Sequence, residues 1–211
     1  MAKAMVMATR NQQVQQVRLF QHEWLERLSR ISPFGFAALW SIVLPMVVWR
    51  AWGSAEVLAA TGLVLGGLAI WALFEYAMHR YLFHWQPRAA VLRNFVFLMH
   101  GNHHAAPSDG LRNLMPPVVS LPISGTVWAL CVAALGTSGS WVFLGFITGY
   151  VLYDITHYAC HQWPMKGRIP SMLKRHHMRH HHVREDGNYA ITALFLDRWF
   201  GTAITSLQKR D

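Results

Sequence analysis

Histidine is the residue whose clustering in this sequence most directly suggests chemistry. The chain contains thirteen histidines, and twelve of them lie in four short stretches. These stretches read HRYLFH, HGNHH, HYACH and HHMRHHH, at residues 79–84, 100–104, 157–161 and 176–182. Scattered core or surface histidines would not gather in this way, and imidazole nitrogens are common ligands of transition metals. The sequence therefore predicts a metal site, whereas the remaining histidine, His22, is interpreted as a surface residue.

The spacing of the histidines indicates helices and two metal ions. Residues three or four apart lie on one helix face, and three of the stretches meet that condition. In the first stretch His79 and His84 are five apart, about 140° around an ideal helix. We expect His79 on the last turn of an apolar helix, with His84 reaching back from a bend or a lower turn. Ten imidazoles exceed the four to six ligands of one zinc or iron ion and suit two ions. The predicted ligands are His79, His84, His100, His103, His104, His157, His161, His177, His180 and His181.

Two acidic residues lie about one helical turn before predicted ligands. Glu75 precedes His79 by four residues, and Asp154 precedes His157 by three. An ionisable side chain in a membrane-spanning helix is costly and usually functional. Metal-bound histidines commonly donate their second N–H to a carboxylate. We therefore predict that Glu75 and Asp154 orient histidines, with a role at a helix end as the alternative.

The ligand types favour oxygen chemistry over hydrolysis. The zinc hydrolase pattern H-E-x-x-H, with its activating glutamate, is absent from the sequence. Iron cycles between redox states and activates dioxygen, which zinc does not. The sequence therefore predicts two iron ions with dioxygen as co-substrate, and zinc can replace iron in purified protein. The first and third histidine stretches lie at the ends of long apolar runs that can cross a membrane. A metal site at the edge of a membrane points to the acyl chain of a lipid as substrate.

Four apolar runs must position these residues. Residues 33–49 and 57–78 are long enough to cross a bilayer outright, and two more runs follow at roughly 118–136 and 141–158. A hydrocarbon core of about 30 Å needs about 20 apolar residues in a helix. We therefore predict an all-α integral membrane protein. It has four transmembrane helices in two hairpins and a cytosolic helical cap that carries the dimetal site. Buried helices of a soluble protein are the alternative for each run.

Basic residues are distributed unevenly between the two sides of these predicted spans. The formal net charge is +9, and 18 of the 19 Lys and Arg residues fall on the side that holds both termini, with Arg50 as the exception. The positive-inside rule assigns that side to the cytoplasm. We therefore predict a multi-pass membrane protein with its active site and both termini on the cytoplasmic face. This charge distribution argues against nucleic acid as a partner.

The N-terminal residues are predicted to form a segment of their own. We assign residues 1–32 to an amphipathic interfacial segment and residues 33–211 to the membrane-embedded domain. Apolar residues recur at three- and four-residue spacing through residues 12–31, which indicates a helix. The membrane interface and the surface of the protein itself are both open as its location.

Glycine and cysteine give weaker indications. The glycine pairs at residues 62–66 and 145–149 match the GxxxG pattern, which permits close approach of two helices. Two cysteines, Cys131 and Cys160, are too few for a disulfide framework. Cys160 is interpreted as a packed thiol, with metal ligation as the alternative.

The segments that carry the histidines resemble a known family. They read WALFEYAMHRYLFH, FLMHGNHH with LMPP after it, GYVLYDITHYACH, and LKRHHMRHHH followed by DRWFGT. They resemble the fatty acid hydroxylase superfamily (sterol desaturase family), and within it the fatty acid 2-hydroxylases, over roughly residues 70–205. The resemblance implies a four-span membrane enzyme with a cytosolic helical cap. Such an enzyme uses a histidine-bound dimetal centre and dioxygen to hydroxylate C2 of an acyl chain. The family's histidine ligands carry over to the ten histidines given above.

Departures from the family pattern leave alternatives open. Many eukaryotic members carry an N-terminal haem-binding domain that supplies electrons, and the residues before the first span are too few for one. A separate electron-donor protein is therefore expected. Some members have a second histidine where this chain has Gln162. Oxidation of a sterol or a carotenoid is the alternative within the class, and a membrane metal-binding or transport protein is the alternative outside it. A transporter carries ligands near the bilayer midplane, but the first and third predicted spans hold no His, Asp or Glu.

Overall fold

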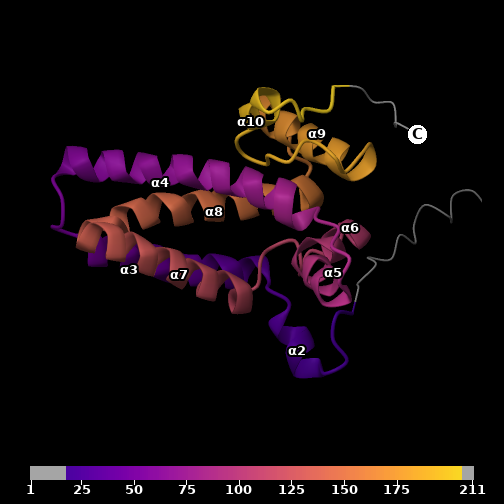
Figure 1. Ribbon diagram of the computed structural model, residues 1–211, viewed down its shortest axis with the longest axis horizontal. Coiled ribbons are helices and arrows are strands. Elements are labelled where there is room, and N and C mark those ends of the chain that lie inside the picture. The colour runs from indigo at the N-terminus through magenta and orange to yellow at the C-terminus, as the bar shows by residue number, and fades with distance from the viewer. Residues whose placement is uncertain (1–17, 206–211) are drawn as a thin grey trace, which may run out of the picture.

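The chain folds into a helical bundle with a cluster of short helices at one end (Figure 1). The computed structural model describes residues 18–205, which form helices and loops and no strand. The long helices are α3 (Pro33–Ala51), α4 (Val57–Ala77), α7 (Pro117–Leu135) and α8 (Gly139–Gln162). The short ones are α2 (Glu23–Leu28), α5 (Ala90–Val96), α6 (Asn102–Ala105), α9 (Arg168–His182) and α10 (Phe195–Trp199). The prediction of an all-α protein is confirmed for this part of the chain.

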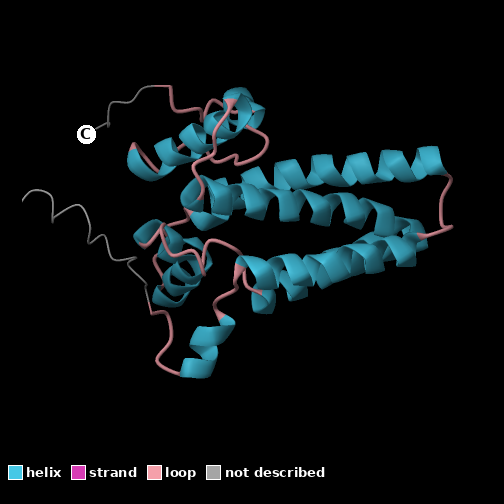
Figure 2. Cartoon of the chain, turned by 180° about the vertical axis from the view of Figure 1, so that it is seen from behind, coloured by secondary structure: helices cyan, strands magenta, loops and turns pink. Residues whose placement is uncertain are grey.

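The long helices are apolar on their outer surface. Among residues 18–205, three helical segments are long and apolar enough to cross a membrane, namely Pro33–Ala51, Val57–Phe83 and Pro117–Gln162. The third segment contains both α7 and α8, between which the chain reverses at a 3-10 turn, Gly136–Ser138 (Figure 2). Large apolar side chains point outward along the bundle, and Phe34, for example, is 84% exposed. Apolar helices of this length with an apolar exterior are typical of a membrane protein.

Helix α8 is the centre of the bundle and packs against α3, α4 and α7. Its core contacts are aromatic. The ring of Tyr150 lies 5.3 Å from that of Trp40 on α3, and the ring of Phe146 lies 5.1 Å from that of Trp71 on α4, both edge to face. Edge-to-face pairs are a favourable arrangement of aromatic rings. This aromatic layer fixes α4 relative to α8, and three of the predicted ligands, His79, His157 and His161, lie at or just beyond the ends of these two helices.

Glycines allow the backbones of α4 and α8 to approach closely. A Cβ atom on Gly67 would lie 2.0 Å from the carbonyl oxygen of Val142, and one on Gly145 would lie 2.0 Å from that of Val64. Real Cβ contacts are never this short, so only glycine fits at these two positions.

The two GxxxG pairs differ in their role. In the pair at residues 145–149 both glycines lie at the contact, since a Cβ on Gly149 would meet the Trp71 ring at 2.5 Å. In the pair at residues 62–66 neither does, since a Cβ on Gly62 or Gly66 would have no neighbour within 4 Å. The interpretation of this first pair is therefore wrong, and the adjacent Gly67 makes the contact.

Two π-helical segments lie where the first histidines occur. Residues Met78–Phe83 continue α4, and residues Phe97–Gly101 join α5 to α6. Hydrogen bonds in a π-helix join residues five apart. His79 and His84 are therefore about one turn apart, and their ring centroids are 5.1 Å apart. A π-helix takes the place of the bend or lower turn that the sequence predicts.

The N-terminal segment is less helical than its periodicity predicts. Residues 12–17 lie outside the described residues, and residues 18–31 contain only the short helix α2. The buried Glu26 carboxylate accepts hydrogen bonds from the backbone N–H groups of Leu19 and Phe20, each at 3.0 Å. These bonds fold the preceding residues back onto α2, so a continuous helix through residues 18–22 does not form.

Glu26 also attaches α2 to the rest of the protein. Its carboxylate pairs with Arg30 and Arg112, and Arg112 donates a further bond to Asp109 at 2.6 Å. Burial raises the pKa of Glu26, but the backbone hydrogen bonds and the two arginines together hold it below its usual value. These contacts attach the described part of this segment to the protein, and Trp24 beside them remains 63% exposed.

Candidate metal centre

Ten histidines converge at one end of the bundle in two groups of five. Within each group the ligand nitrogens lie within 4.8 Å of one another. The first group contains His79, His84, His100, His104 and His180. The second group contains His103, His157, His161, His177 and His181. These are the ten histidines that the sequence predicts as ligands. In the described part of the chain, neither group includes His176, His182 or Cys160.

Helices α6 and α9 contribute histidines to both groups. His103 and His104 are neighbours on α6 and belong to opposite groups. On α9, His177 and His181 are one turn apart and face the second group, whereas His180 faces the first. The rings of His104 and His181 are stacked with their centroids 4.3 Å apart, so the two groups share a wall. The sequence predicts that the histidines of each stretch lie on one helix face. In the structure α6 and α9 lie between the two groups and direct histidines to both of them.

Backbone carbonyls fix which ring nitrogen faces the centre of the first group. The Nδ1 atom of His79 lies 2.5 Å from the carbonyl oxygen of Tyr189, and that of His180 lies 2.8 Å from the carbonyl oxygen of Gly187. A carbonyl oxygen can only accept a hydrogen bond, so Nδ1 carries the proton in both rings. The Nε2 atom of each ring therefore presents its lone pair to the group.

Two polar residues, Asn113 and Glu185, contact further histidines. The backbone carbonyl oxygen of Asn113 accepts from His157 Nδ1 at 3.1 Å, and the side-chain Oδ1 of Asn113 lies 3.3 Å from Nδ1 of His103. Glu185 lies 3.3 Å from Nδ1 of His104. Neither residue could be predicted from the sequence, because both lie in loops, outside any helical spacing that connects them with a histidine.

The facing lone pairs fit a metal ion in each group. In the first group Nε2 of His100 lies 3.1 Å from Nε2 of His79 and 3.0 Å from Nε2 of His104. In the second group Nε2 of His103 lies 2.9 Å from Nε2 of His157. Two nitrogens bound to one ion at about 2.05 Å and about 90° apart would be separated by about 2.9 Å. A cation between the nitrogens would also relieve the repulsion between their lone pairs.

Burial keeps these imidazoles in the form that binds metal. It lowers the pKa of His84 and that of His104 to about 4 each. Burial, together with the neighbouring imidazoles, lowers the pKa of His177 and of His180 well below the usual value. A neutral imidazole is the ligand form of histidine. At neutral pH these rings therefore need lose no proton before a metal binds.

Glu75 orients a loop and not a histidine ring. Its Oε1 atom accepts the backbone N–H of Ile191 at 2.6 Å and that of Thr192 at 3.1 Å, and its Oε2 atom accepts the Thr192 hydroxyl at 2.7 Å. Ile191 follows two residues after Tyr189, whose carbonyl holds His79. Side chains on a helix tilt toward its N-terminus, so an acid that precedes His79 leans away from it. The structure thus differs from the direct contact that the sequence predicts.

Asp154 has the corresponding role on the other side. Its Oδ2 atom accepts the backbone N–H of Met115 and the hydroxyl of Tyr150, both at 2.9 Å. Met115 lies two residues after Asn113, which holds His103 and His157. Asp154 therefore does not make the direct contact with a histidine that the sequence predicts. It holds the loop in which Asn113 accepts hydrogen bonds from His103 and His157.

Asp197 and His176 fix the same loop that Glu75 holds. The buried Asp197 carboxylate lies 2.9 Å from Nε2 of His176 and accepts the backbone N–H groups of Tyr189 and Ala190 at 2.9 Å each. His176, for which the sequence predicts no role, thus helps to position the carbonyl that holds His79. Asp197 could have been suspected from the DRWFGT motif but not from spacing.

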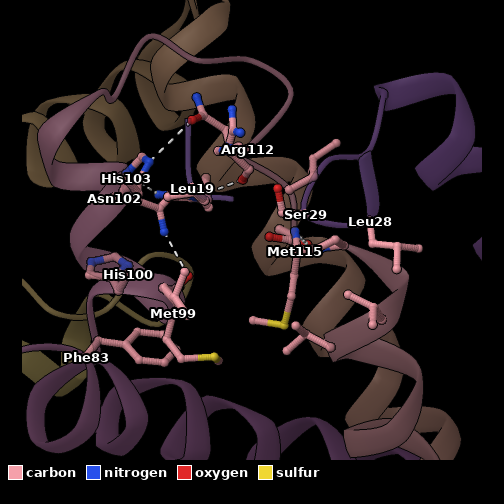
Figure 3. A pocket seen from close by; sticks show the side chains of 18 of the residues that line it. Leu19, Leu28, Ser29, Phe83, Met99, His100, Asn102, His103, Arg112 and Met115 are labelled. Carbon is pink, nitrogen blue, oxygen red and sulfur yellow. Dashed lines mark hydrogen bonds between the residues drawn. The ribbon is translucent and has the colours of Figure 1, made fainter. Parts of the chain in front are cut away.

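An apolar cavity reaches the histidines from the side of α2 (Figure 3). Its volume is about 340 Å³, and His100, His103 and His157 form part of its wall. Apolar side chains from α2, from the segment before α6 and from the start of α7 line most of the rest. We call it the interfacial cavity. A cavity of this size and lining is typical of a site for an apolar ligand.

Fold and site together define a class, namely membrane proteins that hold a histidine-rich metal site at one end of an apolar helical bundle. Comparison with known proteins identifies the family within this class. The sequence model of the family described as "Fatty acid hydroxylase" matches residues 64–202. The chain therefore belongs to the fatty acid hydroxylase family.

Individual relatives agree with this assignment. The chain is 33% identical over 187 residues to the dihydroceramide fatty acyl 2-hydroxylase FAH2 of Arabidopsis thaliana, covering 88% of this chain and 79% of the plant protein. It is also 33% identical to the human fatty acid 2-hydroxylase, covering 88% of this chain but only 56% of the human protein. A solved structure of full-length scs7p, in which only the hydroxylase domain is visible, superposes with a TM-score of 0.78 at 31% identity. That match covers 86% of this chain and 70% of the scs7p chain.

Proposed function

We propose that the protein hydroxylates the acyl chain of a membrane lipid at C2, using dioxygen and two iron ions. The observation that carries this proposal is the pair of five-imidazole groups, whose lone pairs point inward beside the interfacial cavity. The position of the hydroxyl group follows the relatives, which are named fatty acid or fatty acyl 2-hydroxylases. A sterol or carotenoid substrate is the alternative for the same site.

The ten histidines would hold one ion in each group. Iron bound there would supply the redox chemistry that activates dioxygen; nitrogen ligands bind zinc at least as tightly, so purified protein can contain zinc instead. The residues of the chain do the remaining work. The carbonyls of Tyr189, Gly187 and Asn113 hold three rings in the ligand tautomer, and burial excludes water and keeps the rings neutral. The wall of the interfacial cavity brings an acyl chain next to His100 and His157.

The reaction needs electrons from outside this chain. Hydroxylation places one atom of dioxygen in a C–H bond and reduces the other to water, which consumes two electrons and two protons. Imidazoles and carboxylates do not supply electrons. A separate electron-donor protein is therefore part of the proposal.

We place four membrane spans in the chain, α3 and α4 in one helical hairpin and α7 and α8 in another. The reversal at Gly136–Ser138 supports two separate spans within the apolar segment Pro117–Gln162. The short helices and the histidines then form a cap on the cytoplasmic face, which the positive-inside rule favours. The active site and both termini lie on that face.

Reporter fusions test this topology. A reporter fused after residue 211 should be active only as a cytoplasmic protein, and one inserted between α3 and α4, near residue 54, only as an external one. Both predictions follow from the distribution of the basic residues. An external signal from the fusion after residue 211 would invert the placement of the site.

Lipid mass spectrometry under labelled oxygen gas tests the reaction. Cells with the gene should contain acyl lipids heavier by one labelled oxygen atom, located at C2 by fragmentation, and cells without the gene should lack them. Oxygen taken from water would contradict the mechanism. A new double bond without added oxygen would make the protein a desaturase. Detection of an oxidised sterol or carotenoid would mean that this lipid, and not an acyl chain, is the substrate. Unchanged lipids with altered cellular metal content would favour the transport alternative.

A further inference from the structure

A second cavity continues the interfacial cavity into the bundle. It measures about 60 Å³ and lies between α4, α7 and α8, where Trp71, Ser124 and Phe146 contribute to its wall. We call it the bundle cavity. The two cavities share the lining residues Phe83, Met99, Met115 and Tyr153. Figure 3 shows Phe83 and Met99 on one side of this junction and Met115 across from them.

The two cavities differ in the chemistry of their walls. The interfacial cavity carries Asn102, Arg112 and Asn113 besides the histidines. The bundle cavity is mainly aromatic and aliphatic, and two of its polar side chains, Glu75 and Tyr150, form hydrogen bonds within the protein. The Glu75 carboxylate accepts three hydrogen bonds from the loop at residues 191–192, and the Tyr150 hydroxyl donates to Asp154. Both cavities are mainly apolar, but only the interfacial cavity is lined by histidines, so it suits the part of a lipid next to C2, and the bundle cavity suits the hydrocarbon tail.

The distance along α8 between the histidines and the bundle cavity can be compared with the length of an acyl chain. Phe146 precedes His157 by eleven residues on this helix, which corresponds to about 16 Å at the helical rise. An extended hydrocarbon chain advances about 1.25 Å per carbon, given C–C bonds of about 1.5 Å. A chain whose C2 lies at the histidines would therefore reach the level of Phe146 after about 13 further carbons.

We infer that the substrate's acyl tail passes between Met99 and Met115 into the bundle cavity, and that the residues around Ser124 determine which chain lengths are accepted. This inference rests on the proposed function. Methionine side chains are flexible and unbranched, so the junction can widen to admit a chain. In the proposed orientation the bundle cavity lies at the depth of the hydrocarbon core, and the interfacial cavity lies at the level of the lipid head groups. The substrate would then bind at the same depth that it occupies in the bilayer.

Chain-length profiles of the products test the inference. Ser124 is buried and lines the bundle cavity, so Ser124→Leu should fill part of it. In membranes containing the full chain, 2-hydroxylation of acyl chains of about 18 carbons or more should fall at least tenfold relative to chains of about 12 or fewer. Shorter chains end before the added side chain and should be hydroxylated as by the parent protein.

Two further variants make the result decisive. Thr126→Leu adds a similar side chain at an exposed position of the same helix and should leave the profile unchanged. Ile123→Trp narrows the cavity from a position that is 41% exposed, so it should reproduce the effect even if Ser124→Leu does not fold. An unchanged profile, or an equal loss at every chain length, in the folded variants would overturn the inference. Failure of the proposed function is distinguishable, because the parent protein would then form no 2-hydroxy acyl product at any length.

Discussion

Replacing His177 with alanine should abolish the hydroxylated lipid and lower the metal content of the purified protein below two ions per chain. His177 is fully buried in the second group, with Nε2 2.8 Å from Nε2 of His161 and 3.1 Å from Nε2 of His181. Loss of residues that merely orient ligands costs about 10–100-fold in metal affinity or activity, so loss of a ligand should cost at least as much. Metal analysis and lipid mass spectrometry give the two readouts.

His182→Ala is the matched control for this experiment. His182 lies on the same helix, is exposed, and belongs to neither group of histidines. The control variant should keep both metal ions and the product profile of the parent protein. If His177→Ala also retained two ions and the full product, the histidine groups would not be the catalytic centre.

Replacing Gly67 with leucine should prevent the bundle from folding. Even the first side-chain atom at this position would lie 2.0 Å from the carbonyl oxygen of Val142 on α8, so the two helices would have to separate. Overpacking at a backbone contact belongs to the mechanisms that give the largest destabilisation, about 4 kcal/mol or more. The expected result is little or no monodisperse protein on size-exclusion chromatography after extraction from the membrane.

The neighbouring glycine provides a control of the same chemistry. A Cβ on Gly66 would have no neighbour within 4 Å, so Gly66→Leu should change stability by no more than about 0.5 kcal/mol. Comparable yields and melting temperatures for both variants would show that α4 and α8 do not pack at Gly67.

The histidines could be recognised from the sequence because their chemistry depends on residue type and their clustering is rare by chance. All ten fall into two groups of five, the number that the ligand count suggests. The long apolar helices could also be predicted from the sequence, since crossing a bilayer requires long uninterrupted stretches of apolar residues. The spacing rule failed where the helix type changed. His79 and His84 look mismatched on an α-helix, and the π-helix Met78–Phe83 brings them together.

The supporting contacts could not be read from the sequence because they join residues far apart in the chain. Glu75 bonds to Thr192, and Asp154 bonds to Met115. A helical-spacing argument connects each acid only to the nearest histidine on its own helix. The same limit explains why Gly67 was overlooked, because a motif pattern does not say which side of a helix meets its neighbour.

The proton positions on His79 and His180 are determined by main-chain atoms that every amino-acid type possesses. No change of side chain at Tyr189 or Gly187 can delete the carbonyl acceptors, and only a changed path of the loop can. Asn188, which lies between them, has a φ of 54°, a conformation that asparagine tolerates better than most residues. Its side chain donates to the carbonyl of His176 and accepts from the backbone of Ile204. The tautomers of these two rings therefore depend on the path of one loop, which Asn188 holds together with Glu75 and Asp197.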